Sequence, residues 1–429
     1  SIIWNKILKL TVQLILKISL MVLNYIWVLF FLVSFVIAIF KMLAGDTQVI
    51  TQMVNSTFEM SKTAFEISLG LTGVMTLWLG LMKVGEAGGA IKIISKLVGP
   101  FFSRLFPEIP KDHPAMGSIL MNFSANMLGL DNAATPLGLK AMKEIQSLNP
   151  QPERASNAMI MFLTINTAGL TIIPVSILAF RTQAGAANPT DIFLPLLIAT
   201  YGSLLISVFI LALIQKINVL DKVLIGYFLG LIAFIAGLVF MIRTLPLEKM
   251  NKIIDVSGNL IIMSIIVIFI ALAFFKKINV YETFIDGAKE GFQVSITIIP
   301  YLVAMLVGIG LLRSSGTMNI VTQGISSLVA WLGMDTSFTD ALPIAFMKPF
   351  SGSGARGLMV DAMNQYGADS FTGRLSCIMN GATDTTFYIL ALYFGAVGVK
   401  NTRYAAGIGL VADFIGITLA ILLAYLFFM

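Results

Sequence analysis

The sequence contains very little cysteine and histidine. Its 429 residues include one cysteine, Cys377, and one histidine, His113. A single cysteine excludes a disulfide bond within the chain, and these two side chains are too few soft ligands for a transition-metal site. We therefore expect no metal site and no metal-centred enzyme, and the position of His113 in a loop makes hydrolytic chemistry inside the membrane a poor prediction.

Charge is also scarce. Charged residues make up 12% of the chain and hydrophobic residues 57%, with a mean hydropathy of +0.91, whereas soluble domains carry about 25% charged residues. This composition predicts an all-α polytopic protein in a lipid bilayer. The net charge of +6 fits the excess of Lys and Arg in cytoplasmic loops, so we expect no nucleic-acid partner.

The first residues differ from the rest of the chain. Residues 1–21 carry Lys6, Lys9 and Lys17 among Ile and Leu, a pattern typical of a basic amphipathic helix on the membrane surface. In the alternative interpretation, Met21 is the natural start and this lead-in has no function. No cleavable signal peptide is evident.

Long apolar segments predict nine membrane crossings, which are connected by polar loops. They are 22–43, 63–82, 155–180, 192–214, 223–242, 257–275, 291–312, 371–397 and 405–428. Two further regions, 114–142 and 339–363, are apolar at the ends and interrupted in the middle by Gly, Asn, Ser or Pro. They predict re-entrant hairpins covered by protein or water, and the segments before them, 90–106 and 318–332, should lie along the interface.

The two halves of the chain show a weak internal repeat. The motifs "FEIS" at Phe65 and "FQVS" at Phe292 both open a crossing, and Asn166 corresponds to Asn380. Five crossings precede the second repeat when the first crossing is counted. Because five is an odd number, the second repeat would enter the membrane from the opposite side. The sequence thus predicts an inverted repeat of 22–215 and 257–429, joined by a connector at 216–256.

The distribution of positive charge gives an orientation for this topology. With the amino terminus inside, 18 of the 28 Lys and Arg residues fall on the cytoplasmic side. The positive-inside rule therefore places the amino terminus inside and the carboxyl terminus outside a bacterial cytoplasmic membrane.

The segment 374–399 should cross the membrane, yet its middle is polar. It contains Asn380, Thr383, Asp384 and Thr385, and such residues are costly at membrane depth unless they face a cavity or a ligand. Broken helices that meet near the midplane are the signature of secondary transporters. Hydroxyl groups can instead serve helix packing, but packing does not account for Asp384. Asp413 also lies inside a predicted crossing, behind Arg403 or a hairpin.

Residues of the first hairpin and the crossing at 155–180 are rich in oxygen. We assign substrate binding to Asn122, Ser124, Asn126, Asn132 and Thr135, and ion coupling to Asn126, Asp131, Thr164, Asn166, Thr167 and Asp384. Oxygen ligands suit sodium, and Asp384 could ligate a cation, carry a coupled proton or accept a hydrogen bond from the substrate. In the alternative, Asn126 and Asn132 cap the broken helices.

The second hairpin is basic around "GSG". Lys348, Ser351, Ser353 and Arg356 fall within nine residues. Glycine-rich backbone and the start of a helix favour an anionic group, and Arg356 could bind it with two hydrogen bonds. Alternatively, Arg356 pairs internally with Asp361 or Asp384.

Several long motifs resemble a known family. "MNFSANMLGLDNAATPLGLKAM" (121–142) resembles spore maturation protein A, whereas "MKPFSGSGARGLMVDAM" (347–363) and "GATDTTFYILALYFGAVGVKNTRYA" (381–405) resemble spore maturation protein B. Both families carry a nucleoside recognition, or Gate, domain that is similar to part of the concentrative nucleoside transporters and of ferrous iron transporter B. The hairpin tips lack the glutamates expected for ribose binding, and neither hairpin has the Cys or His expected for iron.

The resemblance and the polar breaks together predict an elevator-type secondary transporter. We expect a small polar substrate, anionic or zwitterionic, coupling to Na⁺ or H⁺, no other cofactor, and a homo-oligomer, either a dimer or a trimer. The alternatives are a nucleoside transporter and a non-transporting membrane protein that supports spore or envelope maturation. A channel would need a continuous polar path through the fold.

Overall fold

The computed structural model describes residues 25, 27–110, 112–129, 131–244 and 247–429. All regular elements in this part of the chain are helices, and it contains no strand apart from an isolated bridge between Arg154 and Asn401. The predicted amphipathic segment at 1–21 lies outside the described residues.

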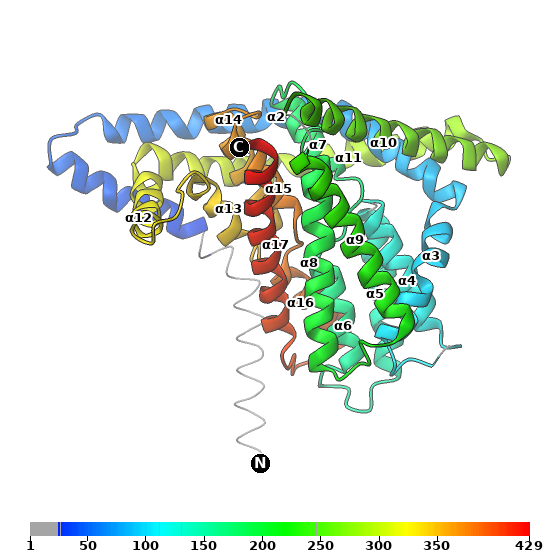
Figure 1. The fold of residues 1–429 in the computed structure, drawn as a ribbon. Coiled ribbons are helices and arrows are strands. Elements are labelled where there is room, and N and C mark those ends of the chain that lie inside the picture. The colour runs from blue at the N-terminus through cyan, green and yellow to red at the C-terminus, as the bar shows by residue number, and fades with distance from the viewer. Residues whose placement is uncertain (1–24, 26, 111, 130, 245–246) are drawn as a thin grey trace, which may run out of the picture.

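The helices follow one another with short connections (Figure 1). After a helix at Trp27–Leu43, they are α2 (Val49–Gly88), α3 (Ala90–Leu105), α4 (Pro114–Met127), α5 (Asp131–Ser147), α6 (Asn157–Thr167), α7 (Val175–Gln183), α8 (Phe193–Ile214), α9 (Lys222–Thr244), α10 (Leu247–Phe275), α11 (Val280–Ser314), α12 (Thr317–Trp331), α13 (Leu342–Met347), α14 (Gly352–Tyr366), α15 (Phe371–Gly381), α16 (Thr386–Ala396) and α17 (Ala405–Phe428).

The same order of elements occurs twice. A long helix (α2 or α11) leads to a shorter one (α3 or α12), then to a pair of helices (α4–α5 or α13–α14), a broken helix (α6–α7 or α15–α16) and an apolar helix (α8 or α17). Helices α9 and α10 lie between the two sets. Each predicted hairpin is therefore a helix–turn–helix, and each segment predicted to precede a hairpin is a separate helix.

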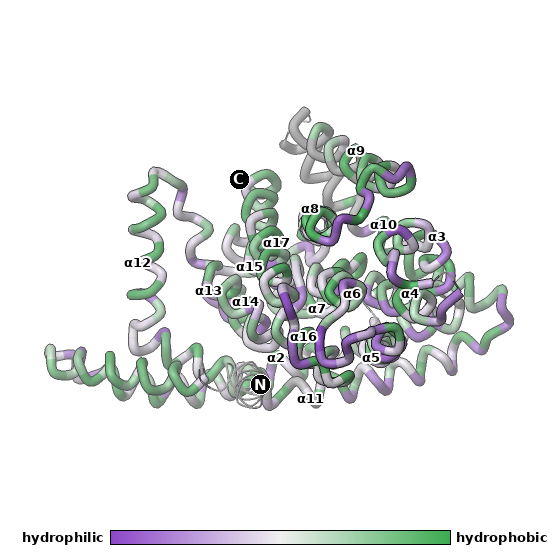
Figure 2. The backbone as a smooth tube through the Cα atoms, turned by 90° about the horizontal axis from the view of Figure 1, so that it is seen from below, coloured by the Kyte–Doolittle hydropathy of each residue, from purple (hydrophilic) through white to green (hydrophobic). Residues whose placement is uncertain are grey.

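Four of the described helices are long and apolar enough to cross a membrane. They are α2, α8, α11 and α17, and the helices Trp27–Leu43 and Asn259–Phe275 are shorter apolar segments of the same kind. Figure 2, in which α8 and α17 are seen nearly end-on, colours these two helices mostly hydrophobic. The protein is a multi-pass helical membrane protein.

The long helices α2 and α11 pack closely along each other in opposite directions. A side chain at Gly287 would lie 2.5 Å from the carbonyl oxygen of Leu79, and one at Gly291 would lie 2.6 Å from that of Met75. Glycine thus lets the two backbones approach, as small residues do in membrane helix pairs. Both helices run across the direction of α8 and α17 (Figure 1), which are themselves antiparallel and joined by a hydrogen bond of 3.0 Å from Ser203 Oγ to the Ala412 carbonyl.

Two predicted crossings are not continuous helices. The segment 155–180 contains α6 and part of α7, and the segment 371–397 contains α15 and α16. Gly169 has a left-handed backbone, with φ +60°, and Pro174 precedes the first residue of α7. The breaks predicted from the polar middles of these crossings are thus confirmed, with 168–174 and 382–385 in unwound backbone, although Thr164, Asn166, Thr167 and Asn380 still lie in the helices before the breaks.

A buried arginine joins the end of α7 to the start of α15. Arg181 is fully buried and donates five hydrogen bonds, to the carboxylates of Asp191 and Asp369 and to the carbonyl oxygens of Asn188, Pro189 and Ala368. Arg374 pairs with the other oxygen of Asp191 at 2.6 Å. Burial raises the pKa of Asp191, and the charges of Arg181 and Arg374 oppose this rise.

Candidate functional site

The two helix breaks touch each other at the centre of the protein. The backbone N–H of Asp384 donates a hydrogen bond of 2.8 Å to the carbonyl oxygen of Thr167. A Cβ atom at Gly169 would lie 2.8 Å from the Asp384 nitrogen and 3.0 Å from the Thr383 carbonyl carbon. The contact therefore requires glycine, both for its positive φ and for the missing side chain.

Each hairpin is fastened to the broken helix of its own half. The N–H of Ile172 donates to the carbonyl oxygen of Met127 at 2.7 Å, and the N–H of Phe387 donates to that of Pro349 at 3.0 Å. In the second half, the rings of Phe350 and Phe387 also stack, with centroids 5.1 Å apart. Each half thus has a backbone bond from its broken helix to its hairpin, which starts within the first break and just after the second.

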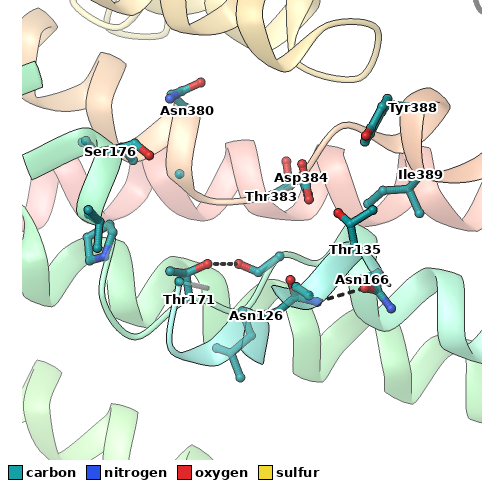
Figure 3. Close-up of a pocket in the computed structure, with 18 of the residues that line it drawn as sticks. Asn126, Thr135, Asn166, Thr171, Ser176, Asn380, Thr383, Asp384, Tyr388 and Ile389 are labelled. Carbon is teal, nitrogen blue, oxygen red and sulfur yellow. Dashed lines mark hydrogen bonds between the residues drawn. The ribbon is translucent and has the colours of Figure 1, made fainter. Parts of the chain in front are cut away.

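A cavity of about 320 Å³ lies where these elements meet. Its lining comes from the first hairpin, both broken helices and the second hairpin. Eight of the predicted site residues line it, namely Asn126, Thr135, Asn166, Lys348, Arg356, Asn380, Thr383 and Asp384. Figure 3 shows Asn126 and Thr135 on the wall opposite Thr383 and Asp384.

The cavity holds both signs of charge. The Lys348 side chain is mostly buried, and the guanidinium of Arg356 lies 5.9 Å above the centre of the Phe180 ring. Asp384 is exposed toward the cavity, and one of its oxygens accepts a hydrogen bond of 2.7 Å from the N–H of Thr385. The two cations and one carboxylate give the described lining a positive balance.

Asp361, one of the two carboxylates considered as an internal partner of Arg356, has a partner on another helix. Asp361 binds Arg313 of α11, whose Nε lies 2.9 and 2.7 Å from its two oxygens. The pair joins α14 to α11 and lies on a separate polar groove between α2, α11 and α14. Arg356, five positions earlier on α14, lines the cavity instead.

Hydrogen bonds within the protein hold the first break in shape. Asn126 Nδ2 donates to Asn166 Oδ1 at 2.9 Å (Figure 3), and Asn166 Nδ2 donates to the carbonyl oxygen of Phe162 at 2.9 Å. Thr164 Oγ1 donates to the carbonyl of Ile160 at 2.9 Å. The first of these bonds joins the end of α4 to α6, and the other two lie within α6.

Several predicted residues support the cavity from outside. Asn122 donates to the Ala134 carbonyl across the first hairpin at 2.8 Å, and Ser124 donates to the Leu120 carbonyl in its own helix at 2.7 Å. The Ser351 hydroxyl accepts a hydrogen bond of 2.9 Å from the N–H of Gly354 and so caps α14. The Ser353 hydroxyl lies 3.2 Å from the Ser351 hydroxyl. Thr164, Thr167 and Thr385 are buried, and the side chains of Asp131 and Asn132 lie outside the described part of the structure.

The sequence analysis did not identify the aromatic wall of the cavity. Tyr388 and Tyr393 of α16 line it, together with Ile389 and Leu392. Residues 388, 389 and 392 share one helix face, which points into the cavity because α16 starts at the break. The polar stretch before α16 could have indicated this aromatic wall, because a helix that begins at a site presents its first turns to that site.

The architecture defines a class of membrane protein in which hairpins and broken helices enclose a central polar cavity. The family described as "Gate: Nucleoside recognition" matches residues 68–183 and 295–400, and the chain belongs to this family. The chain is similar to spore maturation protein A of Bacillus subtilis (strain 168), with 46% identity over 177 residues, which is 41% of this chain and 87% of that protein. It is similar to spore maturation protein B of the same organism, with 42% identity over 153 residues, 36% of this chain and 84% of that protein.

The two Gate matches coincide with the duplicated order of elements. The first runs from within α2 to the end of α7, and the second from within α11 to beyond the end of α16. Both broken helices and both hairpins lie within the matched ranges. The resemblance to both spore maturation families is thus confirmed, and the cavity is formed by the matched parts of the chain.

Proposed function

We propose that this protein is a secondary active transporter of a small polar organic solute. The observation that supports the proposal is the cavity of about 320 Å³ at the contact of two helix breaks. Small-molecule sites have volumes of about 300–1,000 Å³, so this one suits a metabolite of modest size. Discontinuous helices place partial charges at a site within the membrane, as transporters require.

The charges of the cavity favour an anionic or zwitterionic solute. Lys348 and Arg356 can bind a carboxylate or phosphate group, and α16 points its positive end toward the same space. Asp384 can accept a hydrogen bond from an amine or hydroxyl group of the solute. The tyrosines supply an apolar wall with polar tips.

The arrangement of helices supports an elevator mechanism on an inverted repeat. Corresponding helices of the two halves, α2 with α11 and α8 with α17, pack in opposite directions. Each hairpin is fastened to its own broken helix, which lets hairpins, broken helices, α8 and α17 move together against α2 and α11. A proton or sodium gradient would supply the energy.

A nucleoside is a second candidate solute, because the family description names nucleoside recognition. Amide and hydroxyl groups of the cavity could bind a ribose and a base. No glutamate is found among the described lining residues, so a nucleoside would depend on Asp384 and the asparagines. A non-transporting role in maturation is favoured by the names of the relatives, and it predicts no solute at all.

The Asp384→Asn substitution tests the proposed site. We expect a metabolite panel with amino acids, carboxylates, phosphates and nucleosides to contain a compound that stabilises the purified wild-type protein. At about 100 times its dissociation constant, such a compound adds about 2.7 kcal/mol to the stability. The substitution should weaken binding about tenfold or more, because a charged hydrogen-bond partner is lost.

The control is Asp286→Asn, which removes an exposed carboxylate of α11 and should leave binding unchanged. Thermal shift gives the first readout, and uptake of the labelled compound into proteoliposomes gives the second. A panel without any hit, together with an Asp384→Asn protein that behaves like wild type, would support the maturation role instead.

A further inference from the structure

A second cavity, of about 650 Å³, lies between α3, α8 and α9. Its lining comes from these three helices, from α4 and from Leu170 in the first helix break. Most of the lining side chains are apolar, and six that are buried in the protein form its floor, namely Phe101, Phe102, Phe123, Met127, Leu204 and Leu205. The cavity is therefore an apolar recess that reaches into the protein, unlike the outer faces of the helices.

Two glycines of α9 leave room in this recess. Gly226 and Gly230 line it about one turn apart, and a Cβ atom at either position would meet no described atom within 4 Å. Side chains beside the glycines attach α9 to its neighbours. Tyr227 Oη donates a hydrogen bond of 2.6 Å to the Leu97 carbonyl of α3, and the ring of Phe228 lies 5.8 Å from that of Phe209 in α8. Helix α9 is thus held in place while its glycines keep the recess accessible.

One end of the recess carries a positive charge. Lys222 is the first residue of α9 and lines the cavity, and it follows the polar loop 215–221 between two apolar helices. Arg104 of α3 takes the neighbouring carboxylate, Asp221, at 3.2 Å, and no ion pair of Lys222 is found among the described residues. The described lining contains no carboxylate. From Lys222 to Gly230 the recess extends about 12 Å along α9, so it is charged near the membrane surface and apolar further in.

We propose that this recess binds an acyl chain of an anionic phospholipid, with the phosphate group at Lys222. A polar solute would leave its polar groups unpaired against such a lining. A lipid chain is already in apolar surroundings, so its preference for the recess comes from close packing against the aromatic floor and from the charge at Lys222. Basic pockets between membrane helices bind anionic headgroups on the cytoplasmic side, where the sequence analysis places the loop 215–222.

The bound chain would reach the first helix break. Phe123 and Leu170 line both the apolar recess and the solute cavity. Met127, on the floor of the recess, accepts at its carbonyl oxygen the hydrogen bond from Ile172 that fastens the first hairpin to the break. An acyl chain packed there supports one wall of the solute cavity. This effect on the solute depends on the transporter function proposed above, whereas lipid binding does not.

Photocrosslinking on the purified full chain in detergent tests the site. The probes are phosphatidylglycerol and phosphatidylcholine with identical acyl chains, one of which carries a diazirine at its end. We expect cross-links, located by mass spectrometry, at α4, the first break and residues 201–205 of α8, and they should saturate at lower concentrations of phosphatidylglycerol. Lys222→Gln should weaken the apparent affinity for phosphatidylglycerol about fivefold, the effect of one basic residue near the membrane surface, and leave that for phosphatidylcholine unchanged.

A second substitution fills the recess itself. Gly226→Leu places a large side chain where the acyl chain would lie, so cross-links inside the recess should be lost for both lipids. Its matched control is Gly237→Leu, further along α9 and outside the described lining, where a Cβ atom would likewise meet no described atom within 4 Å. Both substitutions replace a glycine within the same helix, so they share the change in helix propensity. Lys289→Gln, on an exposed side chain of α11, is the control for the loss of charge.

Cross-links confined to the outer faces of the helices would overturn the site, because they would show only lipid that surrounds the protein. A Lys222→Gln protein that keeps the wild-type preference for phosphatidylglycerol would overturn the assigned headgroup position. If the recess gives no cross-links and Gly226→Leu changes the oligomeric state in native mass spectrometry, a second copy of the chain occupies it and the lipid proposal fails. None of these results uses the metabolite panel, so a failed lipid site and a failed solute site are told apart.

Discussion

Replacing Gly169 by alanine is expected to separate the two helix breaks and to abolish solute binding. The left-handed backbone costs an alanine about 1–2 kcal/mol, and the new Cβ would stand 2.8 Å from the backbone nitrogen of Asp384. Because the opposing atom belongs to the main chain, a side-chain rotation cannot relieve the contact. We expect the free energy of unfolding to fall by about 2 kcal/mol or more, measured by thermal unfolding alongside ligand binding.

Gly185→Ala is the matched control for this substitution. Gly185 also has a positive φ, +74°, but a Cβ atom there would meet nothing within 4 Å. It should therefore show the backbone cost without the collision and leave solute binding intact. Equal effects of the two substitutions on binding would refute the importance of the contact between the breaks.

The Arg181→Lys substitution is expected to have the largest effect on stability. The guanidinium donates five hydrogen bonds in a fully buried position, whereas an ammonium group has three donors and a different shape. Carbonyl oxygens and a buried carboxylate would lose their partners. Breaking a buried ion pair costs about 3–5 kcal/mol, and we expect a loss of that size in thermal or denaturant unfolding.

Arg104→Lys controls for the change of residue type. Arg104 forms an ion pair with Asp221 at 3.2 Å and its side chain is 42% exposed, so the substitution should cost less than about 1 kcal/mol. Solute binding should survive at low temperature in both variants, since Arg181 does not line the cavity. A stable Arg181→Lys protein would contradict the assigned role of this network.

Much of the central architecture follows from the sequence because polar residues are costly inside a membrane. Asn380, Thr383 and Asp384 interrupt an apolar segment, and this conflict predicts unwound backbone facing a cavity. The two hairpins are predicted by the same kind of pattern, because glycine, asparagine and proline lie between their apolar ends. The structure places eight of the predicted residues on one cavity, although a binding role for them remains a prediction.

The partners of charged residues were less predictable. Asp361, which the sequence offers as a partner for Arg356, is instead bound by Arg313 from 48 positions away. The bond between the Asp384 nitrogen and the Thr167 carbonyl involves backbone atoms, which carry no residue-specific signal. Sequence pattern reports which residues need partners, and the tertiary fold decides which partners they receive.

Helix α2 has 40 residues and α11 has 35, far more than the roughly 20 that span a hydrocarbon layer of about 30 Å. At 1.5 Å per residue, α2 is about 60 Å long, whereas α8, with 22 residues, matches the layer when upright. A helix pair lying across α8 and α17 can use this excess length by crossing obliquely. The inclination of this pair then responds to bilayer thickness through hydrophobic mismatch. Lipids with shorter or longer acyl chains would tilt the α2–α11 pair more than α8. The angle at which the two groups of helices meet would change as a result.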